Sequence, residues 1–367
     1  MTILTNHKVC VSVIIPAFNA APRLLLLLES LERQSCKAFE VIVVDDGSTD
    51  ETRQRILQRI GSYPISLRYY YLDNTEIFGA GIARNYGAKQ ALGDVLLFLD
   101  QDCVAREDLI QNHIHSHTSK DIILGYFAGY GHDTKCYDFS KLKDYIRRRE
   151  TIPVLPEFRD RLFLRETVDD IWHYFVSAHF SIKKKIFKEF NFDEALIQWG
   201  GQDVDLGYRL FKKGCPVYFE KNCLVYNSSR EPMIVKRKAL ELLTSAVYMY
   251  QKHHTDEMKW YYLERFYYVP LKYRGSWQLV VQDDSFEARQ CQTYISIDRN
   301  RNAHIVLGFD FVSLERTIQE ISPLVSRVSF SLHPLGRRRM RRDKALKSSF
   351  RRIWETFKSS EQHHVFY

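Results

Sequence analysis

Two aspartates follow directly on an apolar run in the stretch "LLFLDQDC", where Asp100 and Asp102 are separated only by Gln101. Residues two apart in an extended segment project to the same side, so we expect the two carboxylates to share one face. Carboxylates are the ligands of hard divalent cations such as Mg²⁺ or Mn²⁺, which keep open positions for substrate phosphates. A metal held here would neutralise a departing diphosphate, whereas ordinary loop acids are the alternative.

A second acidic turn, "VVDDGSTDET", places Asp45 and Asp46 at the end of another apolar run. Ser48 and Glu51 form a capping-box pattern, which predicts a helix start directly after the acids. Such a turn directs carboxylates and backbone N–H groups into one cleft. The alternative is that the acids only form the turn and Ser48 only caps the helix.

The segment "GAGIAR" (residues 79–84) is similar to the dinucleotide-binding pattern GxGxxG, but Arg84 stands where the third glycine is needed. This departure disfavours a Rossmann-type cofactor site. The guanidinium fork of Arg84 matches phosphate oxygens, so we expect it to face a phosphate; a surface ion pair is the alternative.

Two more acids, Asp203 and Asp205, follow Gly200 and Gly201 at the start of an amphipathic segment. Aspartate is common at helix starts because it binds free N–H groups and suits the helix dipole. The functional alternative is that one of these two carboxylates is a general base.

The elements that must position these residues alternate between β-type and helical patterns through the first half of the chain. This alternation predicts an α/β fold, a mostly parallel sheet flanked by helices. The acids then lie at the carboxyl ends of strands, the edge at which open α/β sheets bind ligands. The expected strands are 11–15, 39–44, 66–72 and 94–99, with helices from Pro22, after Glu51 and over 82–92.

The later part of the chain is less regular. Residues 134–170 mix charges with prolines, which indicates an excursion over the surface, and a helix over 203–213 is ended by Gly214. A change of composition near residue 231 predicts a boundary between a domain over 1–231 and an extension over 232–367. In that extension we expect a helix over 235–254, a hairpin around Asn300 and Asn302, and a basic helix at the end.

Composition limits the class of protein. The 367 residues are 45% apolar, with no apolar run near the ~18 residues that span a bilayer, so we expect a cytoplasmic protein. The seven cysteines show no CxxC pair, which argues against a disulfide framework or a zinc site.

The net charge of +8 comes from a segment rich in Arg and Lys over residues 337–352. Leu346, Phe350, Ile353 and Phe357 recur there at helical spacing, which predicts an amphipathic basic helix able to make peripheral contact with an anionic membrane. A solvated helix face is the alternative. No nucleic acid partner is expected.

Four segments in order, "VSVIIPAFNA", "VIVVDDGSTDET", "GIARNYGAKQALGDVLLFLDQDC" and "WGGQDVDLGYRL", resemble the signature segments of family 2 glycosyltransferases with the GT-A fold. The last is also similar to the acceptor-side motif of galactosyl- and N-acetylgalactosaminyl-transferases. The resemblance implies an inverting enzyme that moves a sugar from a nucleotide diphosphate donor, with a UDP-sugar expected, to a hydroxyl of a glycan, lipid-linked or peptide acceptor. Glycan or polysaccharide biosynthesis would be its setting.

The resemblance also implies roles at matching positions. Asp203 would be the catalytic base, Asp102 would bind Mn²⁺ or Mg²⁺ as the second acid of a DXD motif, and Asn227 stands where the family often has a metal-binding histidine. An amide oxygen is a weaker ligand than a carboxylate. The donor-binding positions would be Pro16, Phe18 at the base, Asp46 at a ring nitrogen of the base, Arg84 at the diphosphate and Asp100 at the ribose; the acceptor-side positions would be Trp199, Gly201 and Gln202, the last where Glu is usual.

Two other functions compete with this interpretation. A nucleotidyltransferase would need a Gly-rich loop with Arg and Lys near the N-terminus, and "IIPAFNAAPR" lacks it. A degenerate, non-catalytic nucleotide-sugar-binding module is favoured by Asn227 and disfavoured by the presence of both Asp102 and Asp203.

Overall fold

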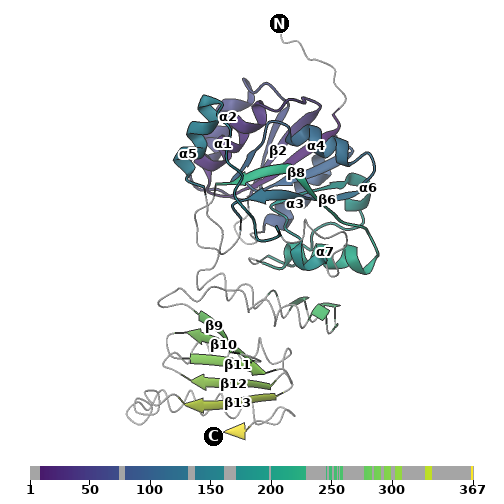
Figure 1. Ribbon diagram of the computed structural model, residues 1–367. Coiled ribbons are helices and arrows are strands. Elements are labelled where there is room, and N and C mark those ends of the chain that lie inside the picture. Colours follow the sequence, from purple (N-terminus) through teal and green to yellow (C-terminus); the bar gives the residue numbers. More distant parts are fainter. Residues whose placement is uncertain are drawn as a thin grey trace. The chain divides into compact units, whose positions relative to one another are not determined.

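The computed structural model describes residues 9–73, 79–130, 137–160, 171–197 and 200–228, and beyond them a few short helical pieces and six strands within 245–366. The chain divides into two compact units, Met1–Glu231 and Pro232–Tyr367 (Figure 1). Each unit is described by itself below.

The first unit is built on an eight-stranded mixed sheet with the order β3-β2-β1-β4-β7-β6-β8-β5. The pairs β1–β2, β1–β4, β2–β3 and β6–β8 are parallel, and the other three are antiparallel. The four strands expected from the sequence are confirmed within one or two residues. The strands are β1 (Val11–Ala17), β2 (Phe39–Asp45), β3 (Leu67–Tyr71), β4 (Val95–Leu99), β5 (Cys103–Ala105), β6 (Ile122–Ala128), β7 (His179–Lys183) and β8 (Tyr218–Asn227).

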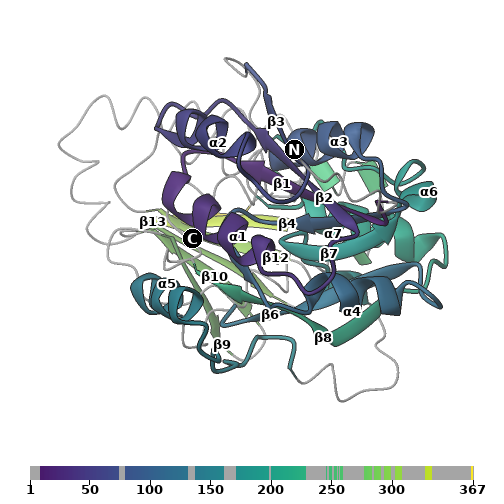
Figure 2. The ribbon, with the colours of Figure 1, turned by 90° about the horizontal axis from the view of Figure 1, so that it is seen from above.

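Helices cover both faces of this sheet (Figures 1 and 2). Alternate residues of β1 enter different cores: Val13 packs with Leu28 of α1, whereas Ile14 packs with Ala83 of α3 and Leu206 of α7. Two-sided burial explains why the central strands are continuously apolar. The helices are α1 (Ala21–Glu32), α2 (Thr52–Ile60), α3 (Ala80–Gln90), α4 (Leu109–Ser116), α5 (Phe139–Arg148), α6 (Lys184–Phe187) and α7 (Gln202–Lys212), with a 3₁₀ turn over Ile171–Tyr174.

The capping box predicted at Ser48 and Glu51 is wrong. Helix α2 begins at Thr52, and its N-cap residue Glu51 makes no side-chain cap bond; the Asp50 carboxylate accepts the N–H of Thr52 (2.9 Å). The Ser48 hydroxyl instead accepts the backbone N–H of Asn19 (2.9 Å), from the loop after β1. A contact between distant loops thus takes the group that the local pattern assigned to the helix.

The predicted surface excursion over residues 134–170 is only partly right in its described part, residues 137–160: many side chains there are exposed, but several are buried. Helix α5 buries Leu142 and Ile146. Further on, the ion pair of Arg159 with Glu157 (2.9 Å) is fully buried, and Arg159 also donates to the carbonyl of Gly125 in β6 (2.8 Å). Charges that read as solvent-exposed are satisfied inside the core by partners distant in the sequence.

A chain of buried polar side chains links α4 to β7. His113 contacts His179 (Nε2 to Nε2, 3.1 Å) and the hydroxyl of Ser181 (2.8 Å), and His117 contacts the same hydroxyl (2.7 Å). The outer ring nitrogens of His179 and His117 face the backbone carbonyls of Tyr126 and Lys120. We call these three imidazoles and Ser181 the histidine chain.

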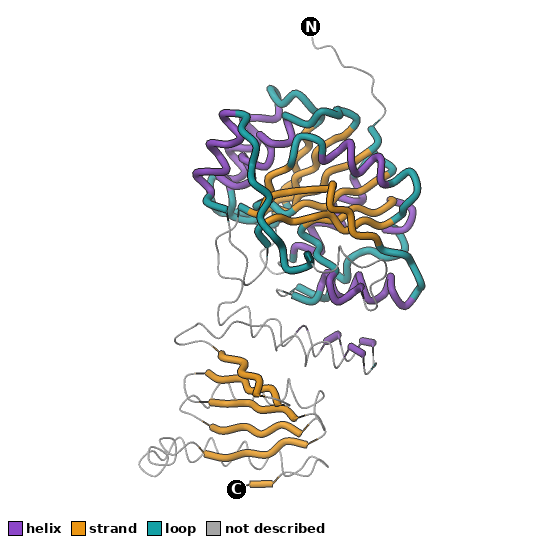
Figure 3. Tube along the Cα trace, viewed as in Figure 1, coloured by secondary structure: helices purple, strands orange, loops and turns teal. Residues whose placement is uncertain are grey.

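The second unit contains a six-stranded sheet with the order β14-β13-β12-β11-β10-β9 (Figure 3). The antiparallel pairing of β11 with β12 confirms the hairpin expected around residues 300–302. The basic helix lies outside the described residues, as does most of the predicted helix 235–254. None of the described helices is long and apolar enough to span a membrane. The strands are β9 (Trp277–Gln282), β10 (Ser285–Gln290), β11 (Thr293–Asp298), β12 (Asn302–Leu307), β13 (Arg327–Leu332) and β14 (Val365–Phe366).

Candidate active site

The first turns of α3 bring together residues from several loops at the carboxyl edge of the sheet. The backbone N–H of Gly79, just before α3, donates to the carboxylate of Asp46 (2.9 Å). One turn into the helix, Arg84 donates to the carboxylate of Asp100 after β4 (2.5 Å). Asp46 and Arg84 are both more than nine-tenths buried. The acidic turn after β2 and the acids after β4 therefore meet on one helix.

Helix α3 packs closely on the sheet because it has a glycine at the contact. A Cβ at Gly87 would lie 2.6 Å from Cγ2 of Ile14 in β1 and 3.2 Å from Cγ2 of Val44 in β2. Only a residue without a side chain lets the helix backbone approach this far. The position of Arg84 relative to the strand ends is thereby fixed.

Arg84 forms an ion pair, as the alternative to a phosphate-facing role expected, but its own side chain is buried. Its partner Asp100 has a side chain that is about one-third exposed. Nε of Arg84 is buried without a hydrogen-bond partner among the described residues. Its expected role at a diphosphate stays a prediction.

The loop after β1 is joined to the loop after β2 by Asn19. This residue has a left-handed backbone (φ 47°), and its amide oxygen accepts the N–H groups of Thr49 (2.8 Å) and Asp50 (3.2 Å). The neighbouring Phe18 side chain is 44% exposed, and Pro16 is buried within β1. The two loops thus form one rigid rim that presents an aromatic ring to solvent.

The acids of "DQD" lie in a tight turn between β4 and β5, so the expectation of an extended segment is wrong. The N–H of Cys103 donates to the carbonyl of Asp100 (3.0 Å), which closes the turn over Gln101 and Asp102. The carboxylates are therefore positioned by the turn and its partners rather than by strand alternation. Asp102 is partly exposed.

Asn227 lies beside this turn. Residue Cys103 of β5 pairs with Asn227 of β8, and Ser228 donates its N–H (2.8 Å) and its hydroxyl (2.6 Å) to the carbonyl of Asp102. The amide nitrogen of Asn227 donates to the carbonyl of Gly129 (3.2 Å), so its amide oxygen is its acceptor end. The structure thus places Asp102 and Asn227, the two residues expected to hold a metal, on backbone segments that lie side by side.

Cys103, next to these acids, is a neutral core thiol. Burial, and then the carboxylates of Asp102 and Asp100, raise the pKa of Cys103 well above its ordinary value. Its sulfur lies 3.4 Å from the carbonyl oxygen of Ala178. A group held in the thiol form is a poor nucleophile, so Cys103 is not a candidate for nucleophilic chemistry.

At the start of α7, two glycines are required by the backbone. Gly200 and Gly201 both have φ 87°, in the left-handed region. The next residue, Gln202, is buried and donates to the carbonyl of Leu196 (2.6 Å), and a Cβ at Gly81 of α3 would lie 3.6 Å from its amide. The start of α7 therefore packs against the first turn of α3. Trp199 lies outside the described residues.

The two acids of α7 differ in environment. Asp205 is fully buried and bonded to Arg209 (2.7 Å). Asp203 is partly exposed, and its carboxylate accepts the N–H of Val204 (2.9 Å). Of the two candidates left open by the sequence, only Asp203 is accessible to solvent.

One residue of the rim was missed by the sequence analysis. Gln101, between the two acids, accepts the N–H of Phe18 (2.8 Å) and donates to the carbonyl of the same residue (3.2 Å). The sequence offered one indication: the residue between the two acids is a glutamine, whose long amide side chain is not required by a turn.

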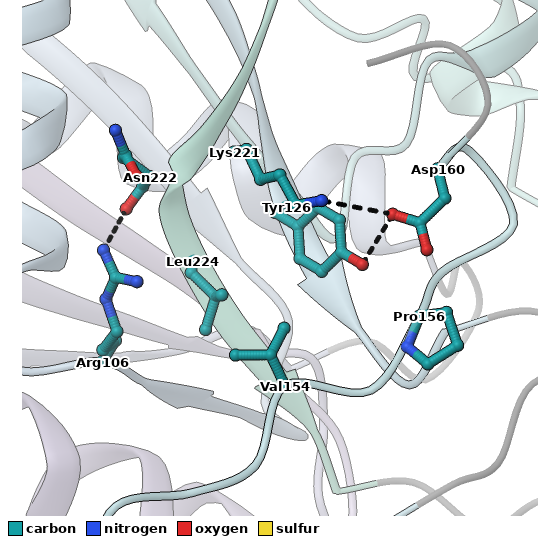
Figure 4. A pocket seen from close by; sticks show the side chains of 8 residues that line it. All are labelled: Arg106, Tyr126, Val154, Pro156, Asp160, Lys221, Asn222 and Leu224. Atoms are coloured by element: carbon teal, nitrogen blue, oxygen red, sulfur yellow. Dashed lines mark hydrogen bonds and ion pairs between the residues drawn. The ribbon is translucent and has the colours of Figure 1, made fainter. Parts of the chain in front are cut away.

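A cavity of about 480 Å³ lies elsewhere in the first unit (Figure 4). Tyr126 and Lys221 both contact Asp160 in its wall, at 2.7 Å and 3.9 Å. No predicted site residue lines it. The lining residues are Arg106, Tyr126, Val154, Pro156, Asp160, Lys221, Asn222 and Leu224.

Comparison with known proteins agrees with this geometry. Residues 12–189 match the family described as glycosyl transferase family 2. The chain is 30% identical to the uncharacterized glycosyltransferase YfnE of Bacillus subtilis, over 55% of this chain and 60% of that protein. It is 32% identical to validoxylamine A glucosyltransferase of Streptomyces hygroscopicus subsp. jinggangensis, over 58% of this chain and 54% of that protein. The chain thus spans little more than half the length of these curated relatives.

Among solved structures, S. aureus TarS 1–349 in complex with UDP-GlcNAc superposes with a TM-score of 0.51 at 19% identity, covering 70% of this chain and 71% of that one. Similarity at this level of identity establishes the fold. Residues 12–189 are therefore similar to glycosyl transferase family 2, on a unit with the GT-A fold.

Proposed function

We propose that the Met1–Glu231 unit is the catalytic domain of an inverting glycosyltransferase that moves a sugar from a nucleoside diphosphate donor, a UDP-sugar, to an acceptor hydroxyl. The observation that carries the proposal is the convergence on α3: Gly79 holds Asp46, Arg84 holds Asp100, and Gly81 packs on Gln202 beside Asp203. Residues expected to bind the donor and to activate the acceptor thus belong to one assembly.

The donor side is supported by the rim and the acidic turn. Phe18 offers an exposed ring for a base, and Asp46 and Asp100 offer carboxylate oxygens for polar groups of the nucleoside. Arg84, paired with Asp100, supplies a cation at the same edge for the diphosphate.

The donor atoms at the acidic turn fit a hard divalent cation. Asp102 contributes a carboxylate and Asn227 an amide oxygen, a set that suits Mg²⁺ or Mn²⁺ and leaves positions for diphosphate oxygens. Among the described residues, no group of three or more His, Cys, Asp and Glu side chains could hold a metal ion. Asp102 and Asn227 would hold the ion, which would stabilise the charge of the leaving diphosphate.

Asp203 is proposed as the general base. Its partly exposed carboxylate would take the proton of the acceptor hydroxyl as that oxygen attacks the anomeric carbon from the face opposite the departing diphosphate. This single displacement inverts the anomeric centre. Trp199, Gly201 and Gln202, next to Asp203 in the sequence, would form the acceptor side.

The names of the relatives agree with a role in glycan biosynthesis. Validoxylamine A glucosyltransferase is, by its name, a glucosyltransferase for validoxylamine A, and the glycosyltransferase AmsB of Erwinia amylovora belongs by name to amylovoran biosynthesis. We extend this setting to the present chain, with a glycan, lipid-linked or peptide acceptor and a cytoplasmic site of action. The match to family 2 over residues 12–189 disfavours both the nucleotidyltransferase and the non-catalytic module.

A donor hydrolysis panel tests the proposal because it needs no acceptor. The protein is incubated with UDP-, GDP-, ADP- and dTDP-sugars in Mn²⁺ or Mg²⁺, and release of the nucleoside diphosphate is measured. We expect hydrolysis of a UDP-sugar, loss of that activity in EDTA, and its return with excess Mn²⁺. An Asp102→Asn variant should need a higher Mn²⁺ concentration. Absence of both hydrolysis and UDP binding would contradict the proposed function.

A further inference from the structure

Gln101 has no role in the chemistry described so far, although it lies between the two acids of the turn. Its side-chain amide is bonded at both ends to the backbone of one residue, Phe18, which is 83 positions away in the sequence. The oxygen accepts the Phe18 N–H at 2.8 Å and the nitrogen donates to the Phe18 carbonyl at 3.2 Å. These two hydrogen bonds resemble those between neighbouring strands, but they are made by a side chain.

Phe18 needs such support because it stands at the end of β1, where strand pairing stops. β1 pairs with β2 up to Ala17, the residue before Phe18. The residue after Phe18, Asn19, has a left-handed backbone. Asn19 is held by Thr49 and Asp50 on the side of β2. On the opposite side of the loop, β1 pairs with β4, and Gln101 follows β4.

Gln101 is also held in place itself. The turn that carries it is closed by the bond from Cys103 N–H to Asp100 O, and the next residue, Asp102, is anchored through its carbonyl to Ser228. The amide therefore starts from a fixed backbone, and both of its polar ends are used by Phe18. A group arranged in this way acts on a ligand through Phe18.

We propose that Gln101 is a positioning residue for nucleobase recognition: it fixes the Phe18 ring over the base of the nucleoside diphosphate and couples that ring to the acidic turn. The proposal rests on the proposed donor site. In this arrangement Gln101 controls the affinity for the base, whereas Asp100 and Asp102 act at the ribose and the diphosphate.

The test compares two ligands that share the diphosphate but not the nucleoside, which is the base with its ribose. UDP and inorganic pyrophosphate, each with Mn²⁺, are titrated by calorimetry into wild type and Gln101→Met, which keeps the length of the side chain and removes both hydrogen bonds. We expect UDP binding to weaken about five- to tenfold, the equivalent of one or two modest hydrogen bonds, and pyrophosphate binding to change less than about twofold. Gln58→Met, on the exposed face of α2, is the matched control and should leave both affinities unchanged.

Three further measurements separate positioning from a general structural role. In hydrolysis of the preferred donor, Gln101→Met should raise KM and leave kcat nearly unchanged. Gln101→Glu, which keeps the acceptor for Phe18 N–H but opposes the Phe18 carbonyl, should give an intermediate or larger loss of UDP affinity. In a Phe18→Ala background, Gln101→Met should weaken UDP binding by less than about a further twofold, because the ring through which Gln101 acts is gone.

Distinct outcomes identify which proposal fails. If Gln101→Met binds UDP as wild type does, or loses pyrophosphate affinity in parallel with UDP affinity, the positioning role is overturned and the proposed function stands. If its effect persists in full without the Phe18 ring, Gln101 does not act through Phe18. If wild type binds neither UDP nor any other nucleoside diphosphate, the proposed function fails, and the role of Gln101 fails with it.

Discussion

At the scale of single residues, α7 presents two aspartates whose environments differ although only one residue separates them. Asp205 is fully buried and bonded to Arg209, which also donates to the carbonyl of Asn191 (2.6 Å). Asp203 is partly exposed, and its carboxylate accepts the backbone N–H of Val204. The helix thus separates a carboxylate that stabilises the fold from one that is accessible for proton transfer.

This contrast gives a paired prediction. Asp203→Asn should lower the rate of sugar transfer about 10²- to 10⁴-fold, because an amide cannot accept the proton, and should leave UDP affinity and thermal stability nearly unchanged. Asp205→Asn should instead lower the free energy of unfolding by about 1 to 3 kcal/mol, because it breaks the ion pair with Arg209. It should leave the rate of sugar transfer nearly unchanged. Steady-state kinetics, UDP titration and urea unfolding of both variants test this. Normal transfer by Asp203→Asn would remove it from the chemistry.

Residue-level prediction from the sequence worked where a side chain's role is local to one strand end or helix start. It placed acids at the ends of β2 and β4 and at the start of α7, and the structure has them there. It failed for Gln101, because the partner of that amide is 83 residues away and no local pattern indicates it. The same reason explains Ser48, whose hydroxyl is used by Asn19.

At the scale of elements, continuously apolar runs predicted the central strands correctly because both faces of those strands are buried. The mixed-charge region before residue 160 was misread because composition does not reveal a buried ion pair such as Glu157 with Arg159. The turn between β4 and β5 was misread because strand length is decided by pairing with β7 and β8, which lie far along the chain.

The histidine chain between α4 and β7 makes the stability of the first unit sensitive to acid. Burial lowers the pKa of His117 from 6.5 to about 4 and that of His179 to about 3, with a further contribution from Arg159 to the latter. Burial and the two neighbouring imidazoles lower the pKa of His113 in the same direction. The unfolded chain then binds these protons more readily than the folded one, so stability is complete above pH 6.5 and is lost as the pH falls towards 4.

The expected loss is about 2 kcal/mol for each of His117 and His179 near pH 5. Urea unfolding at pH 7, 6 and 5 measures it. Replacement of His117 by Gln should make the pH dependence shallower, because one titrating group is gone, whereas His115→Gln, at an exposed position of α4, should leave it unchanged. Equal stability at pH 7 and pH 5 would show that the imidazoles of the histidine chain do not stay neutral in the folded protein.

At the scale of the whole molecule, charge is concentrated outside the unit that holds the candidate site. The basic segment over residues 337–352 belongs to the Pro232–Tyr367 unit. An anionic membrane surface is the partner that such a segment suits, and it is where lipid-linked acceptors reside.

We therefore expect the full chain to co-sediment with vesicles that contain about 30% anionic lipid, and a chain ending at Gly336 to bind them at least about fivefold more weakly, since each basic residue near such a surface contributes roughly 1 kcal/mol. High salt should release the full chain. Vesicles of neutral lipid are the control for apolar adsorption. Equal sedimentation of the two forms would exclude this segment as the attachment point.

The pairing of β5 with β8 also determines when the two sides of the candidate site are completed during synthesis. The carbonyl of Asp102 is anchored by Ser228, 126 residues further along the chain. At about 5 to 20 residues per second, the ribosome adds that stretch in roughly 6 to 25 seconds. In that interval the contacts of Phe18 with Gln101 and of Asp46 with Gly79 can already form, since all four residues have been made. A nascent chain that stalls before Tyr218 would thus carry the contacts of Phe18 and Asp46 without the strand β8 that pairs with β5.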